Sequence, residues 1–179
     1  IRDFGTAQDF ENVVEFLFTK DNAAFNETLA IYDKSYFSHN FITKSGIIEK
    51  SAELLGIDPG HVQSYGPHLM VNKPSSESRL YTWHSEASWF PKRRRFINIW
   101  IPVVRAKNKK NGTMFFKEKS HLRTDWPFSE FQGYKNDSLG NQKFYIQYEI
   151  PNEEQEHLKE VHVEAERGDV VFFDRTSLY

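Results

Sequence analysis

The tripeptide His84-Ser85-Glu86 places an imidazole and a carboxylate two residues apart, in a segment that reads as extended chain. In a β-strand, residues i and i+2 point to the same side of the sheet, so both groups could hold one metal ion. One histidine and one carboxylate are two of the three protein ligands in the 2-His-1-carboxylate arrangement of non-haem Fe(II) oxygenases. The third ligand must come from another segment.

A His-x-Glu pair is a weak motif alone, because 7 histidines and 25 acidic residues in 179 positions give about one such pair by chance. The chain holds a second pair, His162 and Glu164, in an alternating segment whose apolar row is Val161, Val163 and Ala165. This alternation is typical of a half-buried strand with a solvated acidic face. We therefore interpret the second pair as surface.

The surroundings of His84 differ, since they are aromatic: Trp83, Trp89 and Phe90. Aromatic neighbours suit a dry, walled site. The alternative is a core histidine whose hydrogen bonds are satisfied by a nearby carboxylate.

Four further segments occur in a fixed order around the first pair. They are Asn72-Lys-Pro74, the apolar run Phe96–Val104, Asn111-Gly-Thr-Met-Phe-Phe-Lys-Glu-Lys-Ser-His121 and Glu166-Arg-Gly-Asp-Val-Val-Phe-Phe-Asp174. This ordered set resembles the phytanoyl-CoA dioxygenase family of Fe(II)/2-oxoglutarate oxygenases over about residues 68–179. The resemblance rests on order and spacing more than on any one motif.

The resemblance implies roles for particular residues. His84 and Glu86 match the iron ligands, and Leu69 and Trp100 fall where the family contacts 2-oxoglutarate. Ser120-His121 matches a structural motif, so His121 is not a predicted ligand. The implied activity is hydroxylation of a small molecule, with Fe(II) as cofactor, 2-oxoglutarate as cosubstrate and release of succinate and CO₂.

Two departures from the family pattern are visible. Glu86 stands where Asp is commoner, and the family accepts either carboxylate. The distal histidine is due about eleven residues after Gly168, where the chain has Tyr179. Either a histidine follows just after Tyr179, or the protein lacks this ligand. The chain begins at Ile1 and stops within a strand-like run, so we expect a longer protein whose 2-oxoglutarate-binding arginine also lies beyond Tyr179.

Composition indicates one folded domain over residues 1–179. The apolar share of 39% and aromatic share of 16% exclude a disordered tail, and the absence of cysteine excludes disulfides and thiolate chemistry. No apolar run approaches the ~18 residues of a membrane span, and no secretory leader is visible, so we expect a cytoplasmic protein. The net charge of −2 offers no general attraction to nucleic acid. The oligomeric state is not readable.

The pattern of elements predicts a helical front, residues 1–60, and a strand-rich back, residues 61–179. Helices are expected from a capping signal at Thr6–Asp9, over 22–35, and over 45–55 with an end at Gly56. Strands are expected near 68–72, 79–86, 96–104, 113–117, 142–149, 159–165 and 169–174. We read the polar stretch 121–141 as a long excursion. Short strands after helices imply a jelly roll, which the resemblance narrows to a cupin-like double-stranded β-helix truncated at its C-terminus.

The one basic run is Lys92-Arg93-Arg94-Arg95, between the metal motif and the strand that bears Trp100. Short charged runs are usually solvated, so a hairpin tip is the plain interpretation. The alternative is that Arg93, Arg94 or Arg95 binds an anionic substrate, because guanidinium groups suit carboxylate and phosphate. The substrate itself is not selected by anything in the sequence.

Two other classes of function remain open at this point. One is a catalytically inactive family member, which follows if Tyr179 replaces the distal histidine. The other is a cupin-like binding protein of the same fold, since a fold does not fix a function.

Overall fold

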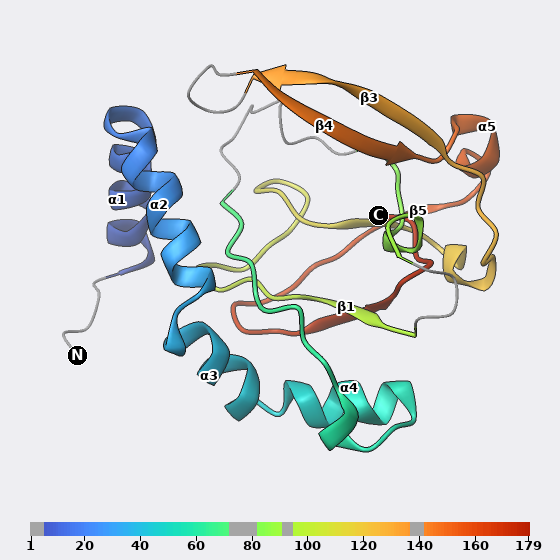
Figure 1. Ribbon diagram of the computed structural model, residues 1–179, viewed down its shortest axis with the longest axis horizontal. Coiled ribbons are helices and arrows are strands. Elements are labelled where there is room, and N and C mark those ends of the chain that lie inside the picture. The colour runs from blue at the N-terminus through green and yellow to red at the C-terminus, as the bar shows by residue number, and fades with distance from the viewer. Residues whose placement is uncertain (1–5, 72–81, 91–94, 137–141) are drawn as a thin grey trace. The chain divides into compact units, whose positions relative to one another are not determined.

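The computed structural model describes residues 6–71, 82–90, 95–136 and 142–179. The chain forms two compact units, Ile1–Asn72 and Lys73–Tyr179 (Figure 1). That both units belong to one oxygenase domain stays a prediction. No helix in the described ranges is long and apolar enough to cross a membrane.

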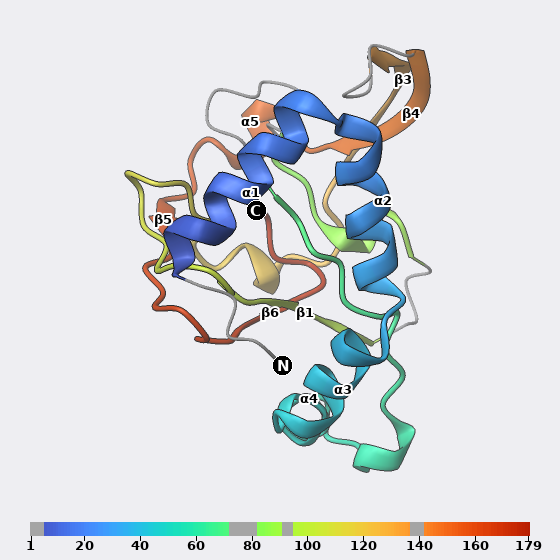
Figure 2. The same cartoon turned by 90° about the vertical axis from the view of Figure 1, so that its left-hand side faces the viewer.

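Within residues 6–71, the first unit contains four α-helices, α1 (Ala7–Lys20), α2 (Asn22–Asp33), α3 (Tyr36–Lys44) and α4 (Ile47–Leu55), followed by the short 3-10 helix η1 (Pro59–His61). Thr6 and Asp9 form the expected capping box at the start of α1. Gly56 ends α4 in the left-handed conformation (φ 65°), as predicted. Helix α3 was not expected, although Ser35 caps its first turn by accepting from the Ser38 N–H. The helices α1 and α2 lie side by side (Figures 1 and 2).

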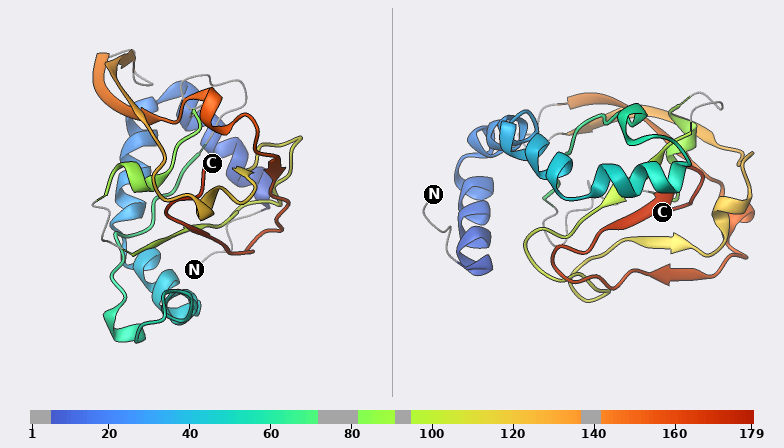
Figure 3. Two further views of the ribbon diagram at one scale, coloured as in Figure 1. Left: turned by 90° about the vertical axis from the view of Figure 1, so that its right-hand side faces the viewer. Right: turned by 90° about the horizontal axis from the view of Figure 1, so that it is seen from below.

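The described residues of the second unit form three two-stranded antiparallel sheets. They pair β1 (Ile97–Trp100) with β6 (Val171–Asp174), β2 (Phe115–Lys117) with β5 (Glu160–His162), and β3 (Ser129–Asn136) with β4 (Gln142–Glu149). Between them lie the short helices η3 (Glu86–Ser88), η4 (Ser120–Leu122) and α5 (Asn152–Gln155). The β3–β4 hairpin is the orange ribbon that projects from this unit in Figure 3. Helices followed by small antiparallel sheets are therefore present, whereas the closed double-stranded β-helix stays a prediction.

Three expectations about strands are wrong. Residues 68–71 form no strand, because the Leu69 N–H donates to the side chain of Asp33 (2.8 Å) instead of a neighbouring strand. The described part of 79–86, residues 82–86, is also not a strand: the chain turns into η3 at Glu86. The stretch 121–141 is not a loop throughout, since it contains β3.

The core of the second unit gathers residues from distant parts of the sequence. Trp126, Ile150 and Leu178 are buried together, and Trp83 and Leu158 pack against them. The Ile150 N–H donates to the carbonyl of Trp83 (2.8 Å), which ties the segment before His84 to this core. Trp83 directly precedes His84, so the packing of Trp83 against this core helps to fix the position of His84.

Candidate functional site

His84 is held by backbone hydrogen bonds to the end of the chain. Its N–H donates to the Tyr179 carbonyl (3.4 Å), and its carbonyl accepts from the Tyr179 N–H (3.1 Å). The ring atom Nδ1 lies 2.8 Å from the Thr82 carbonyl. A carbonyl can only accept, so this contact places the ring proton on Nδ1 and the lone pair of the neutral imidazole on Nε2. A carbonyl partner of this kind commonly orients a metal-binding histidine.

Glu86 is the first residue of η3, and its carboxylate meets the same tyrosine. The Tyr179 hydroxyl donates to Oε1 of Glu86 at 2.5 Å. The rings of Tyr179 and His84 lie 4.6 Å apart between centroids. The imidazole and the carboxylate thus both contact one side chain, although the regular strand expected to align them is absent.

An aromatic wall adjoins Tyr179. The ring of Phe173, on β6, lies 4.8 Å from the Tyr179 ring, and the ring of Phe116, on β2, lies 5.0 Å from that of Phe173. Rings at these separations and tilts are in favourable edge contact. The wall limits water on that side of the two candidate ligands.

The C-terminal segment that carries Tyr179 is anchored on both sides. On one side the Ala87 N–H donates to the Arg175 carbonyl (3.0 Å), and on the other the Lys117 N–H donates to the Leu178 carbonyl (3.0 Å). The buried hydroxyl of Ser120 accepts from the Leu178 N–H (2.9 Å). Ser120 therefore holds the C-terminal segment in place beside the candidate site.

The other residues that the sequence analysis considered lie on several different segments. Trp100 lies on β1 and pairs with Val171. Leu69 belongs to the first unit, and its role stays a prediction. Arg93 and Arg94 lie outside the described residues, and Arg95 is exposed. His121 is exposed, and its carbonyl accepts from the Thr176 hydroxyl (3.0 Å).

Across the described ranges, no three side chains of His, Cys, Asp or Glu gather closely enough to hold a metal ion. His84 and Glu86 thus supply two candidate donors, and the third was predicted just after Tyr179. The chemistry of these two donors fits ferrous iron, because imidazole and carboxylate form its usual protein environment in oxygenases.

The second His-x-Glu pair has a different setting. His162 is half-buried on β5, with its ring 4.4 Å from that of Phe115 and its Nε2 3.2 Å from the Glu160 carboxylate. Glu164 is exposed, as expected of a surface pair, but the surface interpretation is wrong for His162, because the ring packs on Phe115. The carboxylate beside His162 is therefore Glu160, two residues before it, rather than Glu164.

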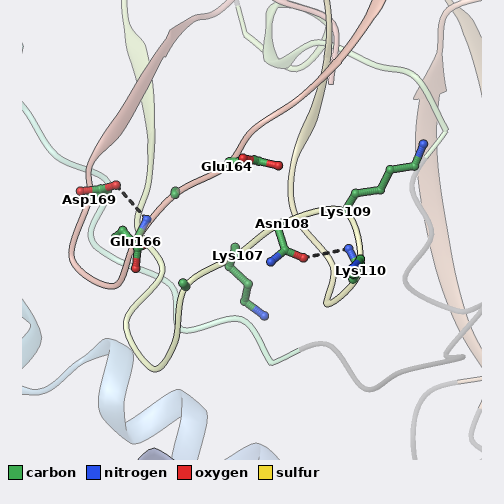
Figure 4. A pocket seen from close by; sticks show the side chains of 9 residues that line it. Lys107, Asn108, Lys109, Lys110, Glu164, Glu166 and Asp169 are labelled. Carbon is green, nitrogen blue, oxygen red and sulfur yellow. Dashed lines mark hydrogen bonds between the residues drawn. The ribbon is translucent and has the colours of Figure 1, made fainter.

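An open hollow of about 420 Å³ lies elsewhere in the second unit, between the chain around the Lys107–Ala165 bridge and the turn at Asp169 (Figure 4). Its charged lining is Lys107, Lys109, Lys110, Glu164, Glu166 and Asp169. The Glu166 N–H donates to Asp169 Oδ2 (2.8 Å), so this acid caps the turn that Gly168 (φ 92°) allows. The hollow shares no residue with the His84–Glu86 site.

Comparison with known families shows which protein family the chain belongs to. A model of the phytanoyl-CoA dioxygenase family matches residues 8–178, nearly the whole chain. The chain belongs to this family. Phytanoyl-CoA dioxygenase relatives are in general iron- and 2-oxoglutarate-dependent oxygenases with a cupin-like fold. No match was found among curated proteins or solved structures.

Sequence reasoning did not identify Tyr179 as a partner of both candidate ligands. In the sequence, Tyr179 is visible only as the residue at the position where a histidine is expected. The signal available in the sequence was the position of Tyr179. A residue at the position of the distal ligand must face His84 and Glu86 if the two segments that carry them pair.

Proposed function

We propose that the protein is an Fe(II)/2-oxoglutarate-dependent oxygenase that hydroxylates a small molecule. The observation that carries the proposal is the meeting of His84 and Glu86 on the side chain of Tyr179, in a chain of this family. His84, through Nε2, and Glu86 would hold the iron, with a histidine beyond Tyr179 as third ligand. Trp100 would contact 2-oxoglutarate, and at least one of Arg93, Arg94 and Arg95 would bind the substrate if the substrate is an anion.

When bound, iron and 2-oxoglutarate would supply the chemistry that reduces O₂: one oxygen atom enters succinate, the other enters the hydroxylated product, and CO₂ is released. The chain contributes orientation and shelter. The Thr82 carbonyl fixes the imidazole of His84, the Tyr179 hydroxyl restrains the carboxylate of Glu86, and the aromatic wall keeps water from one side.

The direct test is turnover of 2-oxoglutarate by the full-length protein. With Fe(II) and O₂, we expect succinate to form slowly even without the native substrate, because such oxygenases show uncoupled turnover. Succinate formation should rise when a panel of small acids and thioesters includes the substrate. Succinate is measured by mass spectrometry, with metal-free protein as the control. A protein that binds Fe(II) and yet never consumes 2-oxoglutarate would contradict the proposal.

A second candidate is a family member that binds a ligand without turnover, and one observation favours it. Tyr179 itself stands beside His84 and Glu86, where a third ligand would be needed, and its hydroxyl occupies Oε1 of the carboxylate. The turnover assay separates the two candidates.

The Tyr179 hydroxyl can also be tested on its own by replacing Tyr179 with Phe. We expect affinity for Mn(II), a redox-silent substitute for Fe(II), to fall about tenfold, because partners that orient metal ligands contribute about 10- to 100-fold. Binding is measured by electron paramagnetic resonance. Tyr36→Phe is the matched control, since Tyr36 is 81% exposed on α3. Equal affinity in both variants would remove Tyr179 from the site.

A further inference from the structure

Asn98, on β1, carries a buried amide that the fold leaves unsatisfied. Its Nδ2 atom is inaccessible to water and has no hydrogen-bond partner among the described residues. More than nine in ten buried polar groups in proteins are paired, because an unpaired one loses its bonds to water without compensation. An orphan of this kind in a strand calls for a partner that the described residues do not supply.

The strand register places Asn98 on the side of the sheet that carries the neighbours of the candidate site. Asn98 pairs directly with Phe173 of the antiparallel partner strand β6, and directly opposed residues share one face of a sheet. Phe173 packs on Tyr179, which in turn contacts Glu86. Ile97 and Ile99, the neighbours of Asn98 along β1, point to the opposite face.

Trp100 lies on the same face as Asn98, two residues further along β1. Two residues of a strand span roughly 6.6 Å, so a small dicarboxylate lying along this face would reach both side chains. An N–H donor suits a carboxylate, which when ionised can only accept, and a hydrogen bond to a charged acceptor is stronger than a neutral one.

We propose that the Asn98 amide donates a hydrogen bond to a carboxylate oxygen of bound 2-oxoglutarate. The inference rests on the proposed function and adds a specificity residue to it. Asn98 is a binding residue, and the cost of leaving its amide unpaired in the empty protein is recovered when the acid binds.

The experiment compares Asn98→Leu, of similar size but apolar, with wild-type full-length protein. Without ligand, the Tm of Asn98→Leu should stay equal or rise by a few degrees, because an unpaired buried amide is removed. Asn111→Leu is the control: the Asn111 amide donates to the Ala106 carbonyl (2.9 Å) and accepts from the Asn108 N–H (2.9 Å), so its loss should lower the Tm.

Calorimetric titration of 2-oxoglutarate in the presence of Mn(II) gives the second readout. Asn98→Leu should weaken binding about tenfold to a hundredfold, the usual range for a bond to a charged group. Asn98→Asp, which sets a negative charge against the carboxylate, should weaken it further.

Each outcome decides something. Wild-type affinity in Asn98→Leu would overturn the inference and leave the proposed function standing. A marked fall in the Tm of unliganded Asn98→Leu would show that the amide is structural and would also overturn it. If wild-type protein binds no 2-oxoglutarate with Mn(II), the proposed function fails, and the inference fails with it.

Discussion

Replacing His84 with Ala is expected to reduce succinate formation to below about one-hundredth of the wild-type rate. Partners that merely orient a metal ligand contribute about 10- to 100-fold, so loss of a ligand should cost more. The backbone bonds between His84 and Tyr179 do not involve the imidazole, and the fold should therefore survive. Succinate release, Mn(II) affinity and the circular dichroism spectrum are measured together.

The matched control is His121→Ala, since His121 is exposed and resembles the family only in a structural motif. It should retain wild-type turnover. If His84→Ala turned over normally, or if both variants lost activity equally, His84 would not be a ligand. The aromatic setting of His84 would then reflect the core-histidine alternative.

Leu178→Ala should give the largest loss of stability. The Leu178 side chain is fully buried and packs with Trp126 and Ile150. Truncation of a buried leucine to alanine usually costs about 2–5 kcal/mol, because transfer energy is lost and a cavity remains. The cost should appear in the free energy of unfolding measured with urea, provided that the transition is two-state.

Leu122→Ala is the control for this change, because Leu122 is 71% exposed and surface substitutions usually stay within about 0.5 kcal/mol. Leu178 directly precedes Tyr179, so Leu178→Ala should also loosen the restraint on Glu86 and weaken Mn(II) binding. Equal stability of the two variants would show that the cluster of Trp126, Ile150 and Leu178 is not the core of the second unit.

Local chemistry made the helices of the first unit predictable. Thr6, Asp9 and Gly56 act through neighbours in the sequence, and their helix ends were correctly anticipated. Helix α3 escaped prediction because its aromatic residues Tyr36 and Phe37 are exposed and give no buried apolar face. A periodic apolar pattern predicts a helix only where the fold buries the apolar side chains on one face.

Strands were less predictable because their partners are distant. The segment Ser129–Asn136 is polar, contains Gly133 and lacks a regular apolar alternation, so it gave no strand pattern, yet it pairs along its whole length with β4. In contrast, apolar runs such as Ile97–Trp100 and Val171–Asp174 were found within the expected ranges. The pairing of these two strands joins distant parts of the sequence, so the local sequence pattern could not predict it.

The candidate site shows the same division. Residue type and spacing selected His84 and Glu86, but the geometry that joins them is a turn at Glu86 and a contact with Tyr179 rather than a strand. The unpaired amide of Asn98 was invisible in the sequence, since only the packing around it shows that it has no partner.

The hydrogen bond between Tyr179 and Glu86 joins residues 93 positions apart, and this has a consequence for folding. Closing so long a loop costs about 4 kcal/mol of chain entropy, apart from a constant, before any contact across it forms. The capped helices close only a few residues each and can form within microseconds. During refolding, Tyr179 should therefore reach Glu86 late, well after α1 has formed, so the restraint on this carboxylate is completed only when the end of the chain docks.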